Sequence, residues 1–295
     1  MKTNAAALPA DRTKTSDYVM LAKPRLNGLV VASALAGYAM AGGDTSDVVR
    51  VCATLLGTAL VASGASAFNQ LLERDSDALM RRTRLRPLPD GRLQPSEALV
   101  FAAALSALGF VVLAVAVNLL SAAVALATLA SYALVYTPLK RRTSFATVIG
   151  AIPGALPPVI GWAAGRGDLS QGAWVLFAIL FLWQLPHFLA IAWIYREDYA
   201  RAGLRMLPVL EPDGRSTARQ AIVYAAALLP VAMAPTLLGM TGTVYFAGAF
   251  VLTAALLVLA VFFAKDRVAQ SARWLFYGSI IYLPLLWILM IADRH

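Results

Sequence analysis

Residues 51–77, VCATLLGTALVASGASAFNQLLERDSD, join a long apolar run to an abrupt acidic end. The run from 51 to 71 carries no charged residue, and about 20 such residues in a helix span the hydrocarbon core of a bilayer. Similar runs occur at 26–41, 99–117, 119–136, 145–164, 173–194, 221–240, 244–264 and 274–291. The sequence therefore predicts an all-α, polytopic membrane protein with about nine transmembrane helices.

The composition of the whole chain agrees with a lipid environment. Hydrophobic residues make up 60% of the 295 residues and charged residues 14%, whereas soluble domains carry about 25% charged residues. The single cysteine, Cys52, excludes a disulfide or a cysteine-based zinc site within one chain. The net charge of +9 comes from short loops between apolar runs, which is typical of a membrane protein and not of a nucleic-acid-binding one.

The positions of lysine and arginine predict the orientation. If the amino terminus is cytoplasmic and nine helices cross the membrane, only Arg50, Arg166 and Arg294 of the 25 basic residues lie outside. Miscounting one span would destroy this bias, since basic residues gather in cytoplasmic loops. We expect an inner-membrane protein with a periplasmic carboxyl terminus, a flexible cytoplasmic tail over 1–17 and one transmembrane domain over 18–295.

The acidic end of the second span suggests a metal site. Asn69, Glu73 and Asp77 follow each other at four-residue steps, each turning only about 40° around a helix, so they share one face. Asp75 lies off this face and is expected to pair with a neighbouring arginine. Oxygen ligands of this kind suit Mg²⁺, which commonly bridges carboxylates to a substrate phosphate. A plain solvated helix end with charge pairs four residues apart is the alternative.

Basic side chains follow the acids directly in the chain. They come from two loops on the same predicted side of the membrane: Arg81, Arg82, Arg84 and Arg86, then Lys140, Arg141 and Arg142. Carboxylates and a metal with guanidinium groups nearby would suit a diphosphate. The alternative is that some of these residues only provide the usual positive charge of cytoplasmic loops.

The sixth span contains the remaining candidates. His187 lies in the apolar stretch WQLPHFLAIAW. A lone histidine is usually a packing residue with its hydrogen bonds satisfied, but an ionisable side chain inside a bilayer is costly and more often functional. Tyr195, Asp198 and Tyr199 follow at the predicted cytoplasmic surface, in the same layer as Glu73 and Asp77.

These motifs resemble the intramembrane aromatic prenyltransferase (UbiA) superfamily, and within it the heme-farnesylating branch, the protoheme IX farnesyltransferases. The first motif of the superfamily, NxxxDxxxD, corresponds to Asn69, Glu73 and Asp77. The run DSDALMRRTRLRPL (75–88) and the segments YTPLKRRT (136–143), WQLPHF (183–188) and YREDYARAGLRMLPV (195–209) are similar to that branch in the same order. The second acidic motif, DxxDD in the wider superfamily, keeps only one acid, Asp198, between two tyrosines.

The resemblance implies a bundle of helices around a central cavity and a Mg²⁺-dependent reaction. Farnesyl diphosphate would donate its farnesyl group to the 2-vinyl group of heme b, giving heme o and diphosphate for terminal oxidases. The implied metal ligands are Asn69, Glu73, Asp77 and Asp198, and the implied catalytic residues are Asp77, Glu73, Asp198 and Lys140. The implied diphosphate contacts are Arg82, Arg86, Lys140, Arg141 and Arg142. The implied heme contacts are His187, Trp183 and Tyr195, and aromatic shelter for an allylic cation is expected from Trp183, Phe188 and Trp193.

The same resemblance implies that the partners are the lipid bilayer and heme A synthase or terminal-oxidase assembly factors, with no nucleic acid. A prenyltransferase with a quinone-type aromatic acceptor is the close alternative. A secondary transporter would place polar residues near the bilayer midplane, whereas the acids here lie at one surface. An alcohol phosphatidyltransferase would require a DG…AR…G…D…D pattern, which the sequence lacks.

Overall fold

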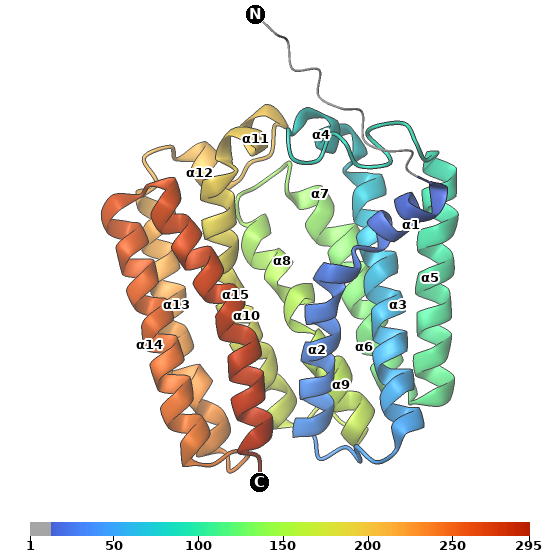
Figure 1. The fold of residues 1–295 in the computed structure, drawn as a ribbon, viewed down its shortest axis with the longest axis vertical. Coiled ribbons are helices and arrows are strands. Elements are labelled where there is room, and N and C mark those ends of the chain that lie inside the picture. Colours follow the sequence, from blue (N-terminus) through green and yellow to red (C-terminus); the bar gives the residue numbers. More distant parts are fainter. Residues whose placement is uncertain (1–12) are drawn as a thin grey trace, which may run out of the picture.

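The computed structural model describes residues 13–295, which form a bundle of long helices (Figure 1). Within this part of the chain, nine stretches are long and apolar enough to cross a bilayer, which confirms the predicted fold class. They are α1 (Lys14–Ala22) with α2 (Pro24–Met40), α3 (Val48–Leu72), α5 (Pro95–Ala116), α6 (Leu119–Ala130) with η1 (Ser131–Tyr136) and α7 (Thr137–Leu139), α8 (Ala146–Ala155) with α9 (Pro157–Arg166), α10 (Gln171–Ile194), α13 (Arg215–Leu237), α14 (Thr243–Asp266) and α15 (Ala269–Ala292).

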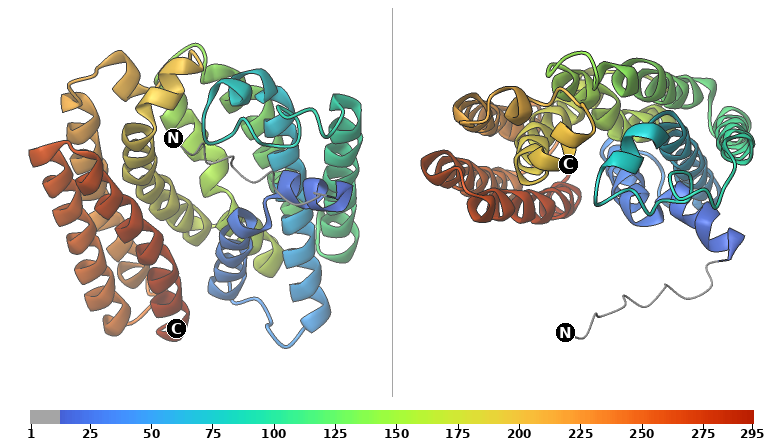
Figure 2. Two further views of the ribbon diagram at one scale, coloured as in Figure 1. Left: turned by 45° about the horizontal axis from the view of Figure 1, so that its top comes forward. Right: turned by 90° about the horizontal axis from the view of Figure 1, so that it is seen from above.

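Three short helices lie between the spans at one end of the bundle: α4 (Arg74–Leu79), α11 (Arg196–Arg201) and α12 (Leu207–Leu210). Figure 1 shows them at the top, together with α1 and α7, while the carboxyl terminus lies at the bottom. The view from above shows the long helices arranged around the middle of the molecule (Figure 2). The loops that carry the predicted site residues therefore meet at the same end of the bundle.

Close packing between α2 and α9 depends on two glycines. A Cβ atom at Gly161 would collide with the carbonyl oxygen of Ala34, and a Cβ atom at Gly37 with that of Pro158. Small residues let transmembrane helices approach closely, since van der Waals packing replaces the hydrophobic effect as a driving force in lipid. These glycines fix α2 against α9 on one side of the central space.

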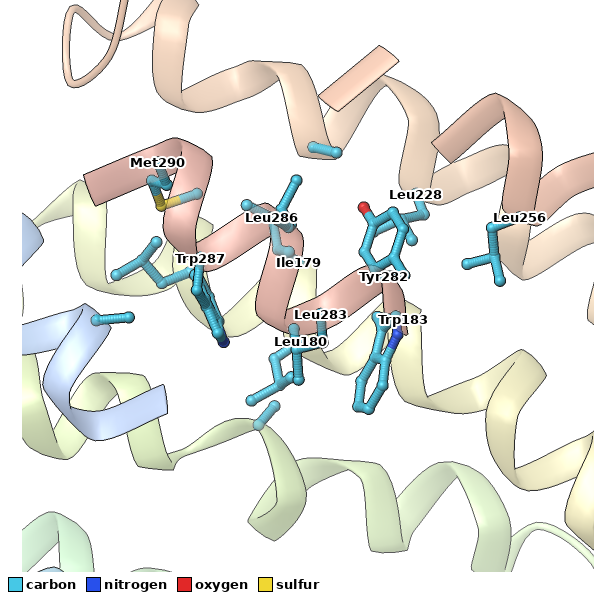
Figure 3. Packing of buried hydrophobic residues seen from close by; sticks show 14 of the residues in the cluster. Ile179, Leu180, Trp183, Leu228, Leu256, Tyr282, Leu283, Leu286, Trp287 and Met290 are labelled. Atoms are coloured by element: carbon cyan, nitrogen blue, oxygen red, sulfur yellow. The ribbon is translucent and has the colours of Figure 1, made fainter. Parts of the chain in front are cut away.

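Apolar side chains join α10 to the three last helices. Figure 3 shows Leu228 of α13, Leu256 of α14 and Tyr282 of α15 in this cluster, with Trp183 of α10 at its edge. Tyr282 is buried and its hydroxyl group lies 3.0 Å from that of Thr253. The buried polar group is therefore paired, as it must be in a site without water.

Two interruptions in the spans have identifiable causes. The fifth span is interrupted where α8 ends at Ala155 and α9 begins at Pro157, a residue without an N–H to continue the helical hydrogen bonds. The fourth span was expected to run as one helix, but its end is a π-helix, η1. The backbone N–H of Thr137 bonds to Tyr132 five residues back, the Thr137 hydroxyl donates to the same oxygen at 2.9 Å, and Pro138 has no N–H to continue the α pattern.

The amino-terminal segment is partly more ordered than expected. Helix α1 begins at Lys14, so residues 14–17 of the expected flexible tail are helical, and the buried Asp17 forms an ion pair with Arg92 at 3.0 Å. Residues 1–12 lie outside the described part of the chain, so that part of the tail stays a prediction. Lys23 separates α1 from α2 with a left-handed backbone (φ 48°), a strained conformation for a residue with a side chain.

Candidate functional site

The predicted acidic face is present although the helix is interrupted within it. Helix α3 ends at Leu72 and α4 begins at Arg74, yet Glu73 N–H donates to Asn69 O (2.9 Å) and Asp77 N–H donates to Glu73 O (2.7 Å). These two bonds keep the four-residue spacing of an α-helix across the break. Asn69, Glu73 and Asp77 are 3%, 9% and 1% exposed, which excludes the alternative of a solvated helix end. Asp75 lies off this face and contacts Arg74 at 3.5 Å, as expected.

Basic side chains pair with two of these acids. Lys140, directly after α7, forms an ion pair with Glu73 Oε1 at 2.7 Å. Arg86 donates to Asp77 Oδ2 at 2.6 Å. The Nδ2 group of Asn69 donates to Thr137 at 3.3 Å, so its carbonyl oxygen remains available. Residues from two distant loops thus converge on the end of α3.

Helix α11 adds the fourth acid to this end of the bundle. Asp198 is 7% exposed, accepts a hydrogen bond from the backbone N–H of Arg81 (3.3 Å) and pairs with Arg201. The Arg82 guanidinium lies over the rings of Tyr195 and Tyr199, 5.0 and 5.2 Å from their centres, and donates to the Tyr199 hydroxyl group. The loop after α4 therefore packs directly on α11.

The carboxylate and amide oxygens of this site are the ligands that a hard cation prefers, and one of them lacks a hydrogen-bond partner. Within the described residues, Asp77 Oδ1 is buried without a hydrogen-bond partner. Burial raises the pKa of Asp77, an effect that the nearby Arg86 charge reduces without cancelling. No three acids, histidines or cysteines among residues 13–295 are already clustered as a metal site. Arg86, Lys140 and Arg201 instead pair with Asp77, Glu73 and Asp198.

The remaining predicted diphosphate contacts lie at the surface. Arg141 and Arg142 are both exposed. The Arg142 carbonyl oxygen accepts a 3.4 Å hydrogen bond from Arg205, and Lys140 O accepts one from the Arg205 backbone (3.0 Å). Of the predicted basic residues, Lys140 and Arg86 contact the first acidic group and Arg82 contacts α11, while Arg141 and Arg142 face solvent.

A cavity of about 310 Å³ lies among α2, α3, α6, η1, α8, α9, α10 and α15. Its walls are mostly apolar, with a few polar groups that include Asn27, Gln184 and His187. Tyr132 and Tyr136 of the π-helix also line it, and Lys140 Nζ lies 4.5 Å from the centre of the Tyr136 ring. Because Lys140 also pairs with Glu73, the cavity and the acidic cluster adjoin at the level of η1.

The predicted aromatic contacts divide into two groups. His187, Trp183 and Phe188 line the cavity, and their expected contacts with heme or an allylic cation stay predictions. Trp193 does not line it. Its ring packs on Phe263 of α14 (5.9 Å between centres), and the Arg196 guanidinium covers it at 4.5 Å, so the prediction that Trp193 shelters a cation is wrong. Tyr195 is 39% exposed and lies under Arg82, away from His187.

Several polar residues near the site were not predicted from the sequence. Lys23, between α1 and α2, lies close enough to Glu73, Asp77, Arg86 and Lys140 for their charges to interact with its own. Asn27 donates to Ala22 O (2.6 Å) and to Ser63 (3.2 Å) at the cavity wall. The signal for Asn27 was an amide in an otherwise apolar span. Tyr132, which lies in the π-helix and lines the cavity, gave no signal in the sequence.

Comparison with known proteins identifies the family. The model of the UbiA prenyltransferase family matches residues 30–283. The chain is 51% identical to the protoheme IX farnesyltransferase of Solibacter usitatus over 94% of its own length and 98% of that protein. Its fold is similar to a solved digeranylgeranylglyceryl phosphate synthase (TM-score 0.79, 17% identity, 95% and 98% of the two chains). It is also similar to a UbiA homologue from Archaeoglobus fulgidus bound to GPP and Mg²⁺ (TM-score 0.65, 17% identity, 93% and 99%).

Proposed function

The chain belongs to the UbiA prenyltransferase family, and we propose that it transfers the farnesyl group of farnesyl diphosphate to the 2-vinyl group of heme b. The observation that carries the proposal is the position of the acidic cluster, with its lysine and arginine partners, directly above an apolar cavity. A polar diphosphate and its apolar tail need these two environments side by side. The name of the Solibacter relative supports heme as the acceptor.

The first role of the charged cluster would be to hold the diphosphate. Asn69, Glu73, Asp77 and Asp198 would bind Mg²⁺, which neutralises negative charge on the leaving group as it departs. Lys140 and Arg86 would exchange their present carboxylate partners for phosphate oxygens, as would Arg82 from its place over the tyrosines. Arg141 and Arg142 would attract the anion at the surface.

The second role falls to the cavity. Breaking the C1–O bond of farnesyl diphosphate leaves an allylic cation, which water would quench in an open site. The mostly apolar walls would exclude water, and the faces of Trp183 and Phe188 would stabilise the cation. The vinyl carbon would then form the new C–C bond, and a later water molecule would supply the hydroxyl group of heme o and release a proton.

The third role is to position the acceptor. His187 lines the cavity, where it would ligate the heme iron, with the Trp183 ring stacked beside it at 5.3 Å. A quinone-type acceptor carries no metal ion that the His187 imidazole could ligate.

The product would pass to heme A synthase or a terminal-oxidase assembly factor. The protein would lie in the inner membrane, with its active site on the cytoplasmic side.

The test is a product assay in membranes that contain the protein. Mg²⁺ and labelled farnesyl diphosphate are supplied with either heme b or 4-hydroxybenzoate, and a parallel reaction contains EDTA. We expect label in heme o only with heme and Mg²⁺. Label in the benzoate and not in heme would contradict the proposed acceptor, and full activity in EDTA would contradict the metal requirement.

A further inference from the structure

Ser279 of α15 contacts two of the polar side chains that α10 presents to the cavity, Trp183 and His187. Trp183 Nε1–H donates to the Ser279 carbonyl oxygen at 2.9 Å, and His187 Nδ1 lies 2.7 Å from Ser279 Oγ. The serine is fully buried. Trp183 and His187 are four residues apart and share one face of α10, so a single residue of the facing helix anchors the pair.

The position of the Ser279 hydroxyl proton indicates which ring nitrogen of His187 is protonated. Ser279 Oγ donates to Phe276 O at 2.6 Å, and a hydroxyl group has one proton to give. The hydrogen bond to Phe276 O favours His187 Nδ1–H as the donor of the 2.7 Å contact and Ser279 Oγ as its acceptor. A neutral imidazole protonated at Nδ1 carries its lone pair on Nε2.

The ring is also fixed in orientation. It lies between Trp183 (5.3 Å, 23° between planes) and Phe276 (5.0 Å, 31°), and it lines the cavity. Within residues 13–295, Nε2 makes no hydrogen bond and is not among the fully buried unpaired atoms. The basic nitrogen therefore faces the open space and not protein.

We propose that Ser279 is a positioning residue that holds His187 in the Nδ1–H tautomer, so that Nε2 would be free to bind the iron of the porphyrin acceptor. The inference rests on the proposed function for its ligand. Histidine ligands of metals usually donate their second ring N–H to such a partner, and loss of that partner typically costs about 10–100-fold in metal affinity. Trp183, bonded to the same serine, would stack beside the bound porphyrin.

Binding of porphyrins to the purified full-length protein tests this without relying on turnover. Heme and metal-free protoporphyrin IX are titrated against the wild type and the variants Ser279→Ala, Ser279→Thr and His187→Ala, with absorbance spectra recorded. The matched control is Ser271→Ala, which removes a buried hydroxyl group from the same helix where it donates only to Val268 O. Each variant is first checked for monodisperse elution.

The following results are expected together. His187→Ala removes the spectrum of histidine-ligated heme, and Ser279→Ala weakens heme binding about 10–100-fold. Ser279→Thr, which keeps a hydroxyl group, stays near the wild type, as does Ser271→Ala. Binding of metal-free protoporphyrin IX is unchanged in Ser279→Ala, because no iron–nitrogen bond is involved.

Two results would overturn the proposal. One is an unchanged heme spectrum and affinity in Ser279→Ala. The other is an equal loss for heme and metal-free porphyrin, which would make Ser279 a packing residue. Failure of the proposed function is a separate outcome: the wild type would form no heme o, while the binding spectra would still decide the role of Ser279. In active protein, Ser279→Ala should raise KM for heme and leave KM for farnesyl diphosphate unchanged.

Discussion

At the scale of single residues, the most specific prediction concerns the effect of Asp77 on farnesyl transfer. It is 1% exposed, with one oxygen atom on Arg86 and the other unpaired among the described residues. Asp77→Asn keeps the shape but removes the negative charge that would bind Mg²⁺, so we expect farnesyl transfer to fall by about 100-fold or more. The measurement is the initial rate of heme o formation at matched protein levels.

The control for this prediction is the neighbouring Asp75. Its side chain is 75% exposed and contacts only Arg74 at 3.5 Å, and exposed ion pairs contribute little. Asp75→Asn should therefore keep the wild-type rate within about twofold, in keeping with the small energies of exposed pairs. Equal losses in the two variants would mean that general charge matters at this end of the bundle and that Asp77 has no specific role.

At the scale of elements, the contact between α2 and α9 is the most sensitive to side-chain size. Gly161→Ala would push a Cβ atom into the Ala34 carbonyl oxygen, and the helices must separate. Overpacking of this kind costs about 1–3 kcal/mol, so the detergent-solubilised protein should unfold at a lower temperature. Gly28→Ala, on α2 with no atom within 4 Å of its new Cβ, should be neutral or slightly stabilising. A thermal midpoint that falls equally in both variants would argue against the close approach.

At the scale of the whole molecule, the distribution of charge predicts which end faces the cytoplasm. The lone cysteine simplifies the test: after Cys52→Ser, one new cysteine reports one loop. We expect a membrane-impermeant maleimide to label Thr45→Cys, in the exposed loop between α2 and α3, in cells whose inner membrane is intact. Arg84→Cys, in the exposed loop after α4, should react only after lysis. The reverse pattern would place the active site on the periplasmic side.

The spans and the acidic face could be predicted from the sequence because their causes are local. A helix satisfies its own backbone in lipid, so a run of apolar residues is enough to specify a span. The four-residue spacing of Asn69, Glu73 and Asp77 likewise survives the break at Glu73, since the backbone bonds on both sides keep the helical spacing. The break between α8 and α9 likewise has a local cause, because Pro157 has no N–H to continue the helical hydrogen bonds.

The rotation of each helix and the partners across the bundle were decided only by the tertiary structure. A helix that is apolar on all sides gives no sequence signal for which side faces lipid and which faces a cavity. For this reason the sequence placed Trp193 in the cavity, whereas it packs on α14. Tyr132 and Lys23 were not predicted to lie near the site. The sequence also did not indicate the contact between His187 and Ser279, which are 92 residues apart. Hydropathy records that a segment enters the membrane, whereas packing against other helices determines what each of its side chains meets there.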